Sequence, residues 1–237
     1  MAHITRKELK KDEFAAEVSK TYEFLQRQRE NVTRYGVAIG AAILVVLGAY
    51  FLLEYRRSGA DEALSHAMRA YHAPLADQAS PSSDAEFKFN DAKARYTQAE
   101  KEFDEIAGKY SWLRQGRAAR YFAALSRKQL GKTDQAISEL QRLASAGDDS
   151  LAGLAKYALA QTYAEQRRAA EAEKLLRELA DKPQEPVTRE IALLALAASL
   201  ETAKPAEARK IYGDLRKSSI KSASLEADRR LQEMKSN

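Results

Sequence analysis

The side chains that could do chemistry in this chain are few and are poorly spaced for a shared site. The three histidines are His3, His66 and His72, and there is no cysteine. His66 and His72 are six residues apart, which places them about 240° around a helix, so they point away from one another and are predicted to pack or to lie on the surface. Asp148 and Asp149, in "AGDDS", are typical of a turn and a helix N-cap.

No nucleotide-binding, nucleophile-elbow or zinc-protease motif occurs along the 237 residues. The absence of cysteine also excludes a disulfide, a thiolate metal site and a thiol nucleophile. We therefore expect no catalytic residues, no metal, no cofactor and no small-molecule substrate, and we predict that the protein is not an enzyme.

The net charge of +5 is spread along the chain and does not form a basic domain. Residues 1–34 carry eight basic and six acidic side chains, and both signs continue through the rest of the sequence. Nucleic-acid-binding proteins usually collect Lys and Arg on one face. Nucleic acid is therefore not an expected partner.

One segment, residues 35–53, has no charged residue: "YGVAIGAAILVVLGAYFLL". Nineteen helical residues rise about 28 Å, close to the ~30 Å of a bilayer's hydrocarbon core. The "EYRR" that follows is no signal-peptidase site, so the segment is predicted to remain as a transmembrane helix. Gly36 and Gly40 have the spacing of a helix-packing motif, although such residues are common in any span.

Residues 1–34 are interpreted as a cytosolic arm. An apolar stripe of Phe14, Val18, Tyr22 and Leu25 is typical of an amphipathic helix, lying on the membrane or simply solvated. More basic residues precede the span than closely follow it, which favours a cytosolic N-terminus and an exported C-terminal body.

The body has an internal period of 36 to 37 residues, which predicts paired helices. In each copy an Ala is followed four positions later by a large apolar residue and three later by another. The four sets are Ala99/Phe103/Ile106, Ala136/Leu140/Leu143, Ala172/Leu176/Leu179 and Ala208/Tyr212/Leu215, and Ala124 and Ala160 of the preceding helices also lie 36 apart.

The copy running Leu159-Ala160-x-x-Tyr163, then Ala172, Leu176, Leu179, Ala180 and Pro183, resembles the tetratricopeptide repeat. The predicted fold class is all-α, with an N-terminal transmembrane helix and a tetratricopeptide-repeat-like α-solenoid. The solenoid covers residues 88–216, after a membrane-exit helix and loop at 54–87 and before a capping helix at 217–237.

In tetratricopeptide stacks the first helix of each pair lines a partner-binding groove. The resemblance implies a groove formed by Tyr121, Leu125, Lys128, Gln129, Tyr157, Gln161, Ala164 and Glu165. Tyr121 and Tyr157 occupy the same repeat position and are expected to form two stacked rings on that face, or else to pack between repeats. Trp112 is expected to pack between repeats rather than to serve as an exposed recognition residue.

The order of arm, span and repeat body resembles the ancillary subunit family of the bacterial Sec translocon. The segment "AEKEFDEIAGKYSWLRQGRAARYFAA" is also similar to periplasmic repeat proteins of envelope assembly. These resemblances imply an inner-membrane adaptor with a periplasmic body that contacts the bilayer and binds proteins such as the Sec translocon or envelope chaperones. The alternative is a structural accessory subunit of a large membrane complex, bioenergetic or in outer-membrane assembly.

Overall fold

The computed structural model describes the backbone of residues 6–76, 87–147 and 150–236, and side chains from residue 35 onward within those ranges to residue 235. Two compact units are present, residues 1–56 and 57–237. The predicted arm stripe, most of the 74–84 loop and the N-cap at Asp148 and Asp149 lie outside the described side chains. The described residues contain no strand, only helices and two isolated bridges, so the all-α class is confirmed.

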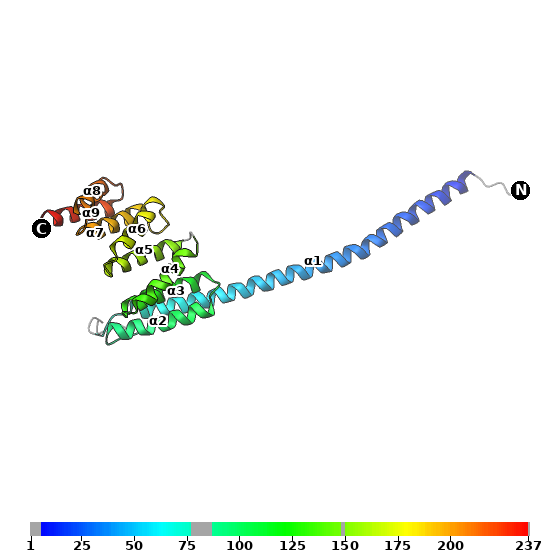
Figure 1. The fold of residues 1–237 in the computed structure, drawn as a ribbon. Helices are drawn as coiled ribbons and strands as arrows, with labels where there is room; N and C mark the ends of the chain where they lie inside the picture. The colour runs from blue at the N-terminus through cyan, green and yellow to red at the C-terminus, as the bar shows by residue number, and fades with distance from the viewer. Residues whose placement is uncertain (1–5, 77–86, 148–149, 237) are drawn as a thin grey trace. The chain divides into compact units, whose positions relative to one another are not determined.

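The helices follow one another closely along the chain (Figure 1). In order they are α1 (Arg6–His72), α2 (Ala92–Lys109), α3 (Arg114–Gln129), α4 (Thr133–Ser145), α5 (Ser150–Glu165), α6 (Ala169–Asp181), α7 (Arg189–Leu200), α8 (Pro205–Leu215) and α9 (Lys221–Ser236).

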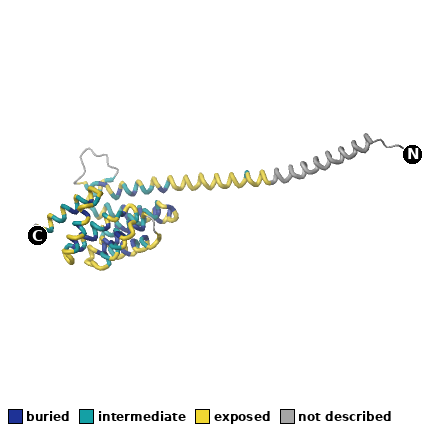
Figure 2. The backbone as a smooth tube through the Cα atoms, turned by 90° about the horizontal axis from the view of Figure 1, so that it is seen from above, coloured by how far each residue is buried: buried dark blue, intermediate teal, exposed yellow. Residues whose placement is uncertain are grey.

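The apolar stretch of α1 is exposed apart from Gly40, which is half-buried (Figure 2). Its large side chains are between 40% (Leu53) and 74% (Val37) exposed. The helix has an 18-residue window of mean hydropathy 2.5 that no part of the structure buries. By length and composition it can cross a membrane, and it is the one such helix among the described residues.

The second unit begins with the C-terminal part of α1, which packs against α2 and α3. Ala60 and Ala67 are fully buried in a cluster with Phe103 of α2 and Ala119 and Ala123 of α3. From α2 onward each helix packs on the next one. The core is thus a series of clusters, each shared between neighbouring helices along the chain.

Contacts between alternate helices divide the unit into two rows. Helix α3 contacts α5, α5 contacts α7, and α7 contacts α9. Within the described ranges no equivalent contact joins α4 to α6 or α6 to α8. Helices α3, α5, α7 and α9 therefore form an inner row, and α4, α6 and α8 form an outer row.

The residues that recur about every 36 positions lie in the packed interfaces between helices. All twelve residues of the Ala/apolar/apolar sets are buried, and the four alanines, with Ala124 and Ala160, have no exposed surface. Side chains this small let helix axes approach closely, and the large residues that follow fill the space toward the next helix.

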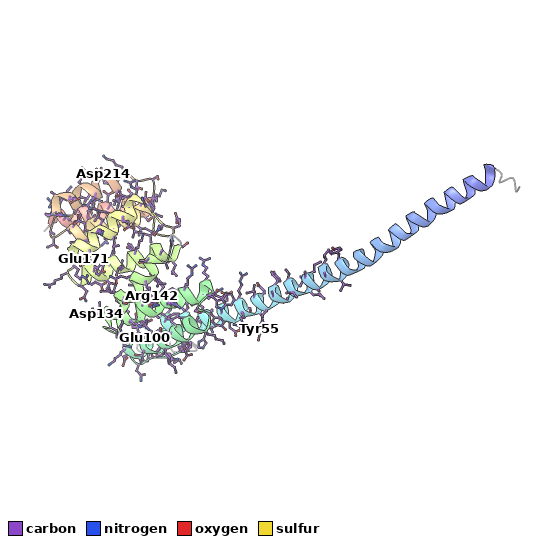
Figure 3. All side chains as sticks on the ribbon, turned by 45° about the vertical axis from the view of Figure 1, so that its right-hand side comes forward. Tyr55, Glu100, Asp134, Arg142, Glu171 and Asp214 are labelled. Atoms are coloured by element: carbon purple, nitrogen blue, oxygen red, sulfur yellow. The ribbon has the colours of Figure 1, made fainter. Side chains whose placement is uncertain are left out.

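Ion pairs add a second link between the helices. Glu100, labelled in Figure 3, is only 9% exposed and accepts from Arg127 of α3 at 3.1 Å and from Lys132 at the start of α4 at 2.7 Å. Glu173 of α6 is paired in a similar way with Lys204, at the start of α8, at 2.9 Å. Each glutamate directly follows a repeat alanine, Ala99 or Ala172.

The turns after α3 and α5 share one backbone geometry. Gly131 has φ of 76° and Arg167, 36 residues later, has φ of 59°. In both turns the following amide, of Lys132 or of Arg168, donates back to a carbonyl five residues earlier, at 2.9 and 2.8 Å. This is a Schellman helix ending, in which glycine is favoured because it has no Cβ.

Arg167 is the residue in this pair for which the left-handed conformation is costly. We expect Arg167→Gly to raise the free energy of unfolding by about 0.5–1 kcal/mol, because glycine adopts positive φ without a steric penalty. Urea unfolding of the detergent-solubilised chain, followed by circular dichroism, measures the shift. Gln166→Gly is the matched control and is expected to destabilise; a loss of stability in Arg167→Gly would contradict the prediction.

Candidate functional site

The residues predicted to form a groove all belong to the inner row. On α3, Tyr121, Leu125 and Lys128 are half-buried and Gln129 is exposed. On α5, Tyr157 is half-buried, whereas Gln161, Ala164 and Glu165 are exposed. The two helices are joined at this face by an ion pair of 2.8 Å from Lys128 Nζ to Glu165 Oε1.

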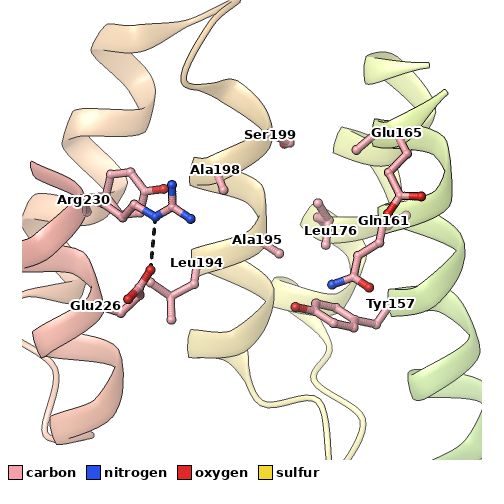
Figure 4. Close-up of a pocket in the computed structure, with 13 residues that line it drawn as sticks. Tyr157, Gln161, Glu165, Leu176, Leu194, Ala195, Ala198, Ser199, Glu226 and Arg230 are labelled. Carbon is pink, nitrogen blue, oxygen red and sulfur yellow. Dashed lines mark hydrogen bonds and ion pairs between the residues drawn. The ribbon is translucent and has the colours of Figure 1, made fainter. Parts of the chain in front are cut away.

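A pocket of about 490 Å³ opens on this face and is bordered by α5, α7 and α9 (Figure 4). All four predicted residues of α5 line it, and none of those predicted on α3 does. The other lining residues were not predicted: Ala160, Leu176, Leu194, Ala195, Ala198, Ser199, Tyr212, Glu226 and Arg230.

The 36-residue spacing could not have identified the α7 side of this pocket. Advancing Gln161 and Ala164 by one period gives Ala197 and Leu200, and both are buried. The lining residues of α7 are instead Leu194, Ala195, Ala198 and Ser199. The face that α7 turns to the groove is therefore offset from the register of α5.

Small side chains keep the pocket open. In Figure 4, Ala195 and Ser199 face the space between α7 and α5, Tyr157, Gln161 and Glu165 face them from α5, and Ala198 lies on the side of α7 toward α9. Alanine and serine extend little beyond the backbone, so a groove remains where larger residues would close it. The walls can cover an apolar side chain, and Gln161, Tyr157 and Ser199 offer hydrogen-bonding groups beside it.

The charged residues of the pocket are paired within the protein. Arg230 donates to Glu226 at 3.1 Å, and Glu201 lies 3.7 Å from the same guanidinium. Tyr212 donates its hydroxyl to Glu201 at 2.6 Å. Hydrogen bonds from Arg229, with Arg230 contributing, lower the pKa of Glu226. Burial, with the bond to Glu201, raises the pKa of Tyr212, so its phenol stays neutral in ordinary buffers.

Tyr121 lies in a different environment from Tyr157. It lines a second hollow of about 440 Å³ with Arg114, Arg117, Phe122 and residues of the first turns of α5. Its ring lies 5.3 Å from that of Phe122, and no ring contact with Tyr157 occurs among the described side chains. The predicted stack is wrong because equivalent positions are one helix spacing apart, about 8–10 Å, beyond ring contact.

The expected packing of Trp112 is also wrong. Its side chain is 55% exposed in the turn between α2 and α3, where the neighbouring Tyr110 and Leu113 are buried instead. The sequence shows only that Trp112 is an apolar residue in a short connection. In the structure the neighbouring Tyr110 and Leu113 occupy the buried positions, so Trp112 is left on the surface.

His66 and His72, the histidines with described side chains, do not share a site. His66 Nδ1 lies 3.0 Å from Glu102 Oε2, and its ring meets Phe87 edge-on at 4.9 Å, whereas His72 is exposed beside Tyr71. The part of the chain with described side chains has no group of three or more His, Asp or Glu residues that could hold a metal.

Gly36 and Gly40 lie in the exposed stretch of α1. A Cβ built on either glycine would meet nothing within 4 Å, so the described residues supply no neighbouring helix at this face.

Comparisons of the chain with protein-family models, with curated proteins and with solved structures find no match. The family resemblance given above therefore rests on the repeat residues and on the order of the segments.

The environment of Tyr121 predicts a loss of stability at high pH. Burial, with the phenols of Tyr71 and Tyr157 nearby, raises the pKa of Tyr121 from 10.0 to about 12. Because the folded state holds this proton more tightly, the contribution is fully present below pH 10 and is lost as the pH rises through 12. We expect Tyr121→Phe to remove about 1.4 kcal/mol of the alkaline loss at pH 11, which lies one unit above the ordinary tyrosine pKa.

Unfolding midpoints measured at pH 8 and pH 11 test this expectation. Tyr96→Phe is the control, since it removes a phenol but leaves Tyr121 in place. Equal alkaline losses in the wild type and in Tyr121→Phe would show that the Tyr121 phenol does not contribute.

Proposed function

We propose that the protein is a membrane-anchored adaptor of the tetratricopeptide type, which holds a helical-repeat body at the membrane and binds segments of other proteins in its inner groove. The observation that carries this proposal is the apolar stretch 35–53 of α1. It presents large side chains such as Val45 and Phe51, 71% and 67% exposed, and a bilayer would cover them.

The repeat character of the body is supported by the buried alanine positions and by the two rows of helices. Repeat proteins stack short helical units so that each contacts its neighbours and leaves an extended inner surface. Such surfaces are used for recognition rather than for catalysis, and peptides that bind them present apolar anchors to pockets.

The pocket between α5, α7 and α9 is the binding site that we propose for those anchors. Its volume of about 490 Å³ exceeds that of any single side chain, so two adjacent residues of an extended or helical segment fit. Arg230 is paired with Glu226, and Glu165 is paired with Lys128. Because both charges are already balanced within the protein, an uncharged side chain can bind beside them.

The resemblance to translocon ancillary subunits supports a bacterial inner-membrane location with the body in the periplasm. On this proposal the partners are exported proteins, the Sec translocon or envelope chaperones. A fixed subunit of a membrane complex would instead have one stoichiometric partner set, and the experiments below separate these two functions.

The anchor predicts that the chain behaves as an integral membrane protein with its C-terminus outside the cytosol. Carbonate washing of vesicles is expected to leave the full chain in the membrane fraction. A reporter enzyme that is active only outside the cytosol, fused after Asn237, is expected to be active. Extraction by carbonate, or activity only from a cytosolic reporter, would refute the anchored topology.

The groove predicts that partners crosslink to the inner row. Photoreactive residues at Gln161 and Ala198, both exposed and both lining the pocket, are expected to capture partner proteins in intact membranes. Lys174, exposed on the outer-row helix α6, is the control position. Ala195→Trp fills the pocket and is expected to lower capture at Gln161 at least about tenfold, since one lost anchor costs more than 1.4 kcal/mol.

Several clients of variable yield at Gln161 would support an adaptor, and a single partner set in constant ratio would support the fixed subunit. Equal capture at Lys174 and Gln161, unaffected by Ala195→Trp, would place the binding surface elsewhere.

A further inference from the structure

The turn between α2 and α3 holds the chain's single tryptophan outward on a well-fixed backbone. Trp112 is 55% exposed, whereas Tyr110 and Leu113 on either side of it are 7% and 6% exposed. The Leu113 amide donates to the Tyr110 carbonyl at 2.9 Å and closes the turn. Gly116 also lies so close to the Tyr110 carbonyl that any Cβ there would overlap it. The indole is therefore presented by a rigid support.

This turn is attached to the chain just after the apolar stretch. Gln115 Nε2 donates to Asp61 Oδ1 at 2.7 Å, and the Tyr110 hydroxyl lies 3.3 Å from where a Cβ of Gly59 would be. Gly59 follows Leu53 by six residues, which span about 20 Å even when fully extended. The turn is therefore attached to the chain a short distance after the apolar stretch ends.

Along the sequence, all the charged residues of the turn and of α3 are basic, although the Asp61 carboxylate of α1 also lies at the turn. From Ile106 to Thr133 the chain has seven Lys or Arg residues and no Asp or Glu. Of these, Arg127, Lys128 and Lys132 pair with carboxylates of α2 and α5. Beside Trp112, Lys109 lies 5.2 Å above the Tyr110 ring, and Arg114 is exposed.

We propose that this turn is a membrane-docking surface, in which Trp112 enters the interfacial layer of the bilayer and Lys109 and Arg114 bind anionic phospholipid headgroups. Tryptophan favours the boundary between headgroups and acyl chains, and basic residues near a membrane are attracted to anionic lipids. The inference rests on the membrane anchor of the proposed function, but it is independent of the groove. Docking would hold α2 and α3 against the membrane and leave α5 to α9 available for partners.

Because Trp112 is the only tryptophan, its fluorescence in the full chain reports the docking directly. The protein is reconstituted into vesicles of phosphatidylcholine with and without phosphatidylglycerol, each prepared with brominated phosphatidylcholine as quencher. The matched reporter is Trp112→Phe with Leu225→Trp, which moves the indole to a side chain of α9 that is 70% exposed. In anionic vesicles, quenching of Trp112 is expected to exceed that of the α9 reporter at least about twofold.

Arg114→Glu tests the charge contribution without opposing the helix, because an acidic residue is favourable at a helix N-terminus. It is expected to reduce the extra quenching in anionic vesicles to the level found with phosphatidylcholine alone, and 0.5 M salt is expected to weaken docking of the wild type. Equal quenching at the two indole positions in anionic vesicles would overturn the docking proposal, as would quenching unaffected by Arg114→Glu and by salt.

Flotation of the same vesicles after carbonate treatment separates the two proposals. If the chain floats with the lipid and Trp112 is not quenched, the anchor holds and the docking surface is refuted. If the chain does not float, the anchor itself fails, and the docking surface fails with it.

Discussion

Close contact between helices through alanine is the constraint on which the rest of the body depends. The alanines of the four repeat sets have no exposed surface, and several more at α1, α3, α5 and α7, among them Ala60, Ala119, Ala155 and Ala192, are fully buried as well. A larger side chain at any of these positions would force two helices apart, because interiors at this density have no spare volume. Phe103, Leu140, Leu176 and Tyr212 then fill the wider gaps, so size alternates along each interface.

The same alternation explains why the groove lies where it does. Successive helices of the inner row contact one another, and they also carry small residues on their accessible side, such as Ala164 and Ala198. On the buried side, small residues bring helices together, and on the accessible side they leave a hollow. Ser126 and Thr162, one period apart and fully buried, each donate to the carbonyl four residues back. These two buried hydroxyls are thus satisfied within their own helices.

Sequence periodicity predicted the helical class and the packing positions, because packing repeats whenever the same helix pair repeats. It was less informative about the groove, since exposure depends on what a neighbouring helix covers. Tyr121 and Tyr157 share a repeat position, yet Tyr121 packs beside Phe122 at a separate hollow and Tyr157 borders the main pocket. The α7 and α9 sides of that pocket were missed for the same reason. One usable signal was overlooked: a glutamate directly after a repeat alanine, with a lysine about 32 residues later, marks the ion pairs at Glu100 and Glu173.

The basic residues between Ile106 and Thr133 have different roles in the folded protein, although they lie close together in the sequence. Basic and acidic residues are mixed along most of the chain, yet every charged residue from Ile106 to Thr133 is basic. Folding divides that stretch in two. At the C-terminal end of α3 and the start of α4, carboxylates from α2 and α5 pair with the basic residues, and the charge there serves to join helices. At the α2–α3 turn, Lys109 lies over a tyrosine ring and Arg114 is exposed beside Trp112. This second group is linked to Asp61 through Gln115, eight residues after the apolar stretch ends at Leu53. The fold, and not the position in the sequence, therefore decides which basic residues join helices and which lie on the surface.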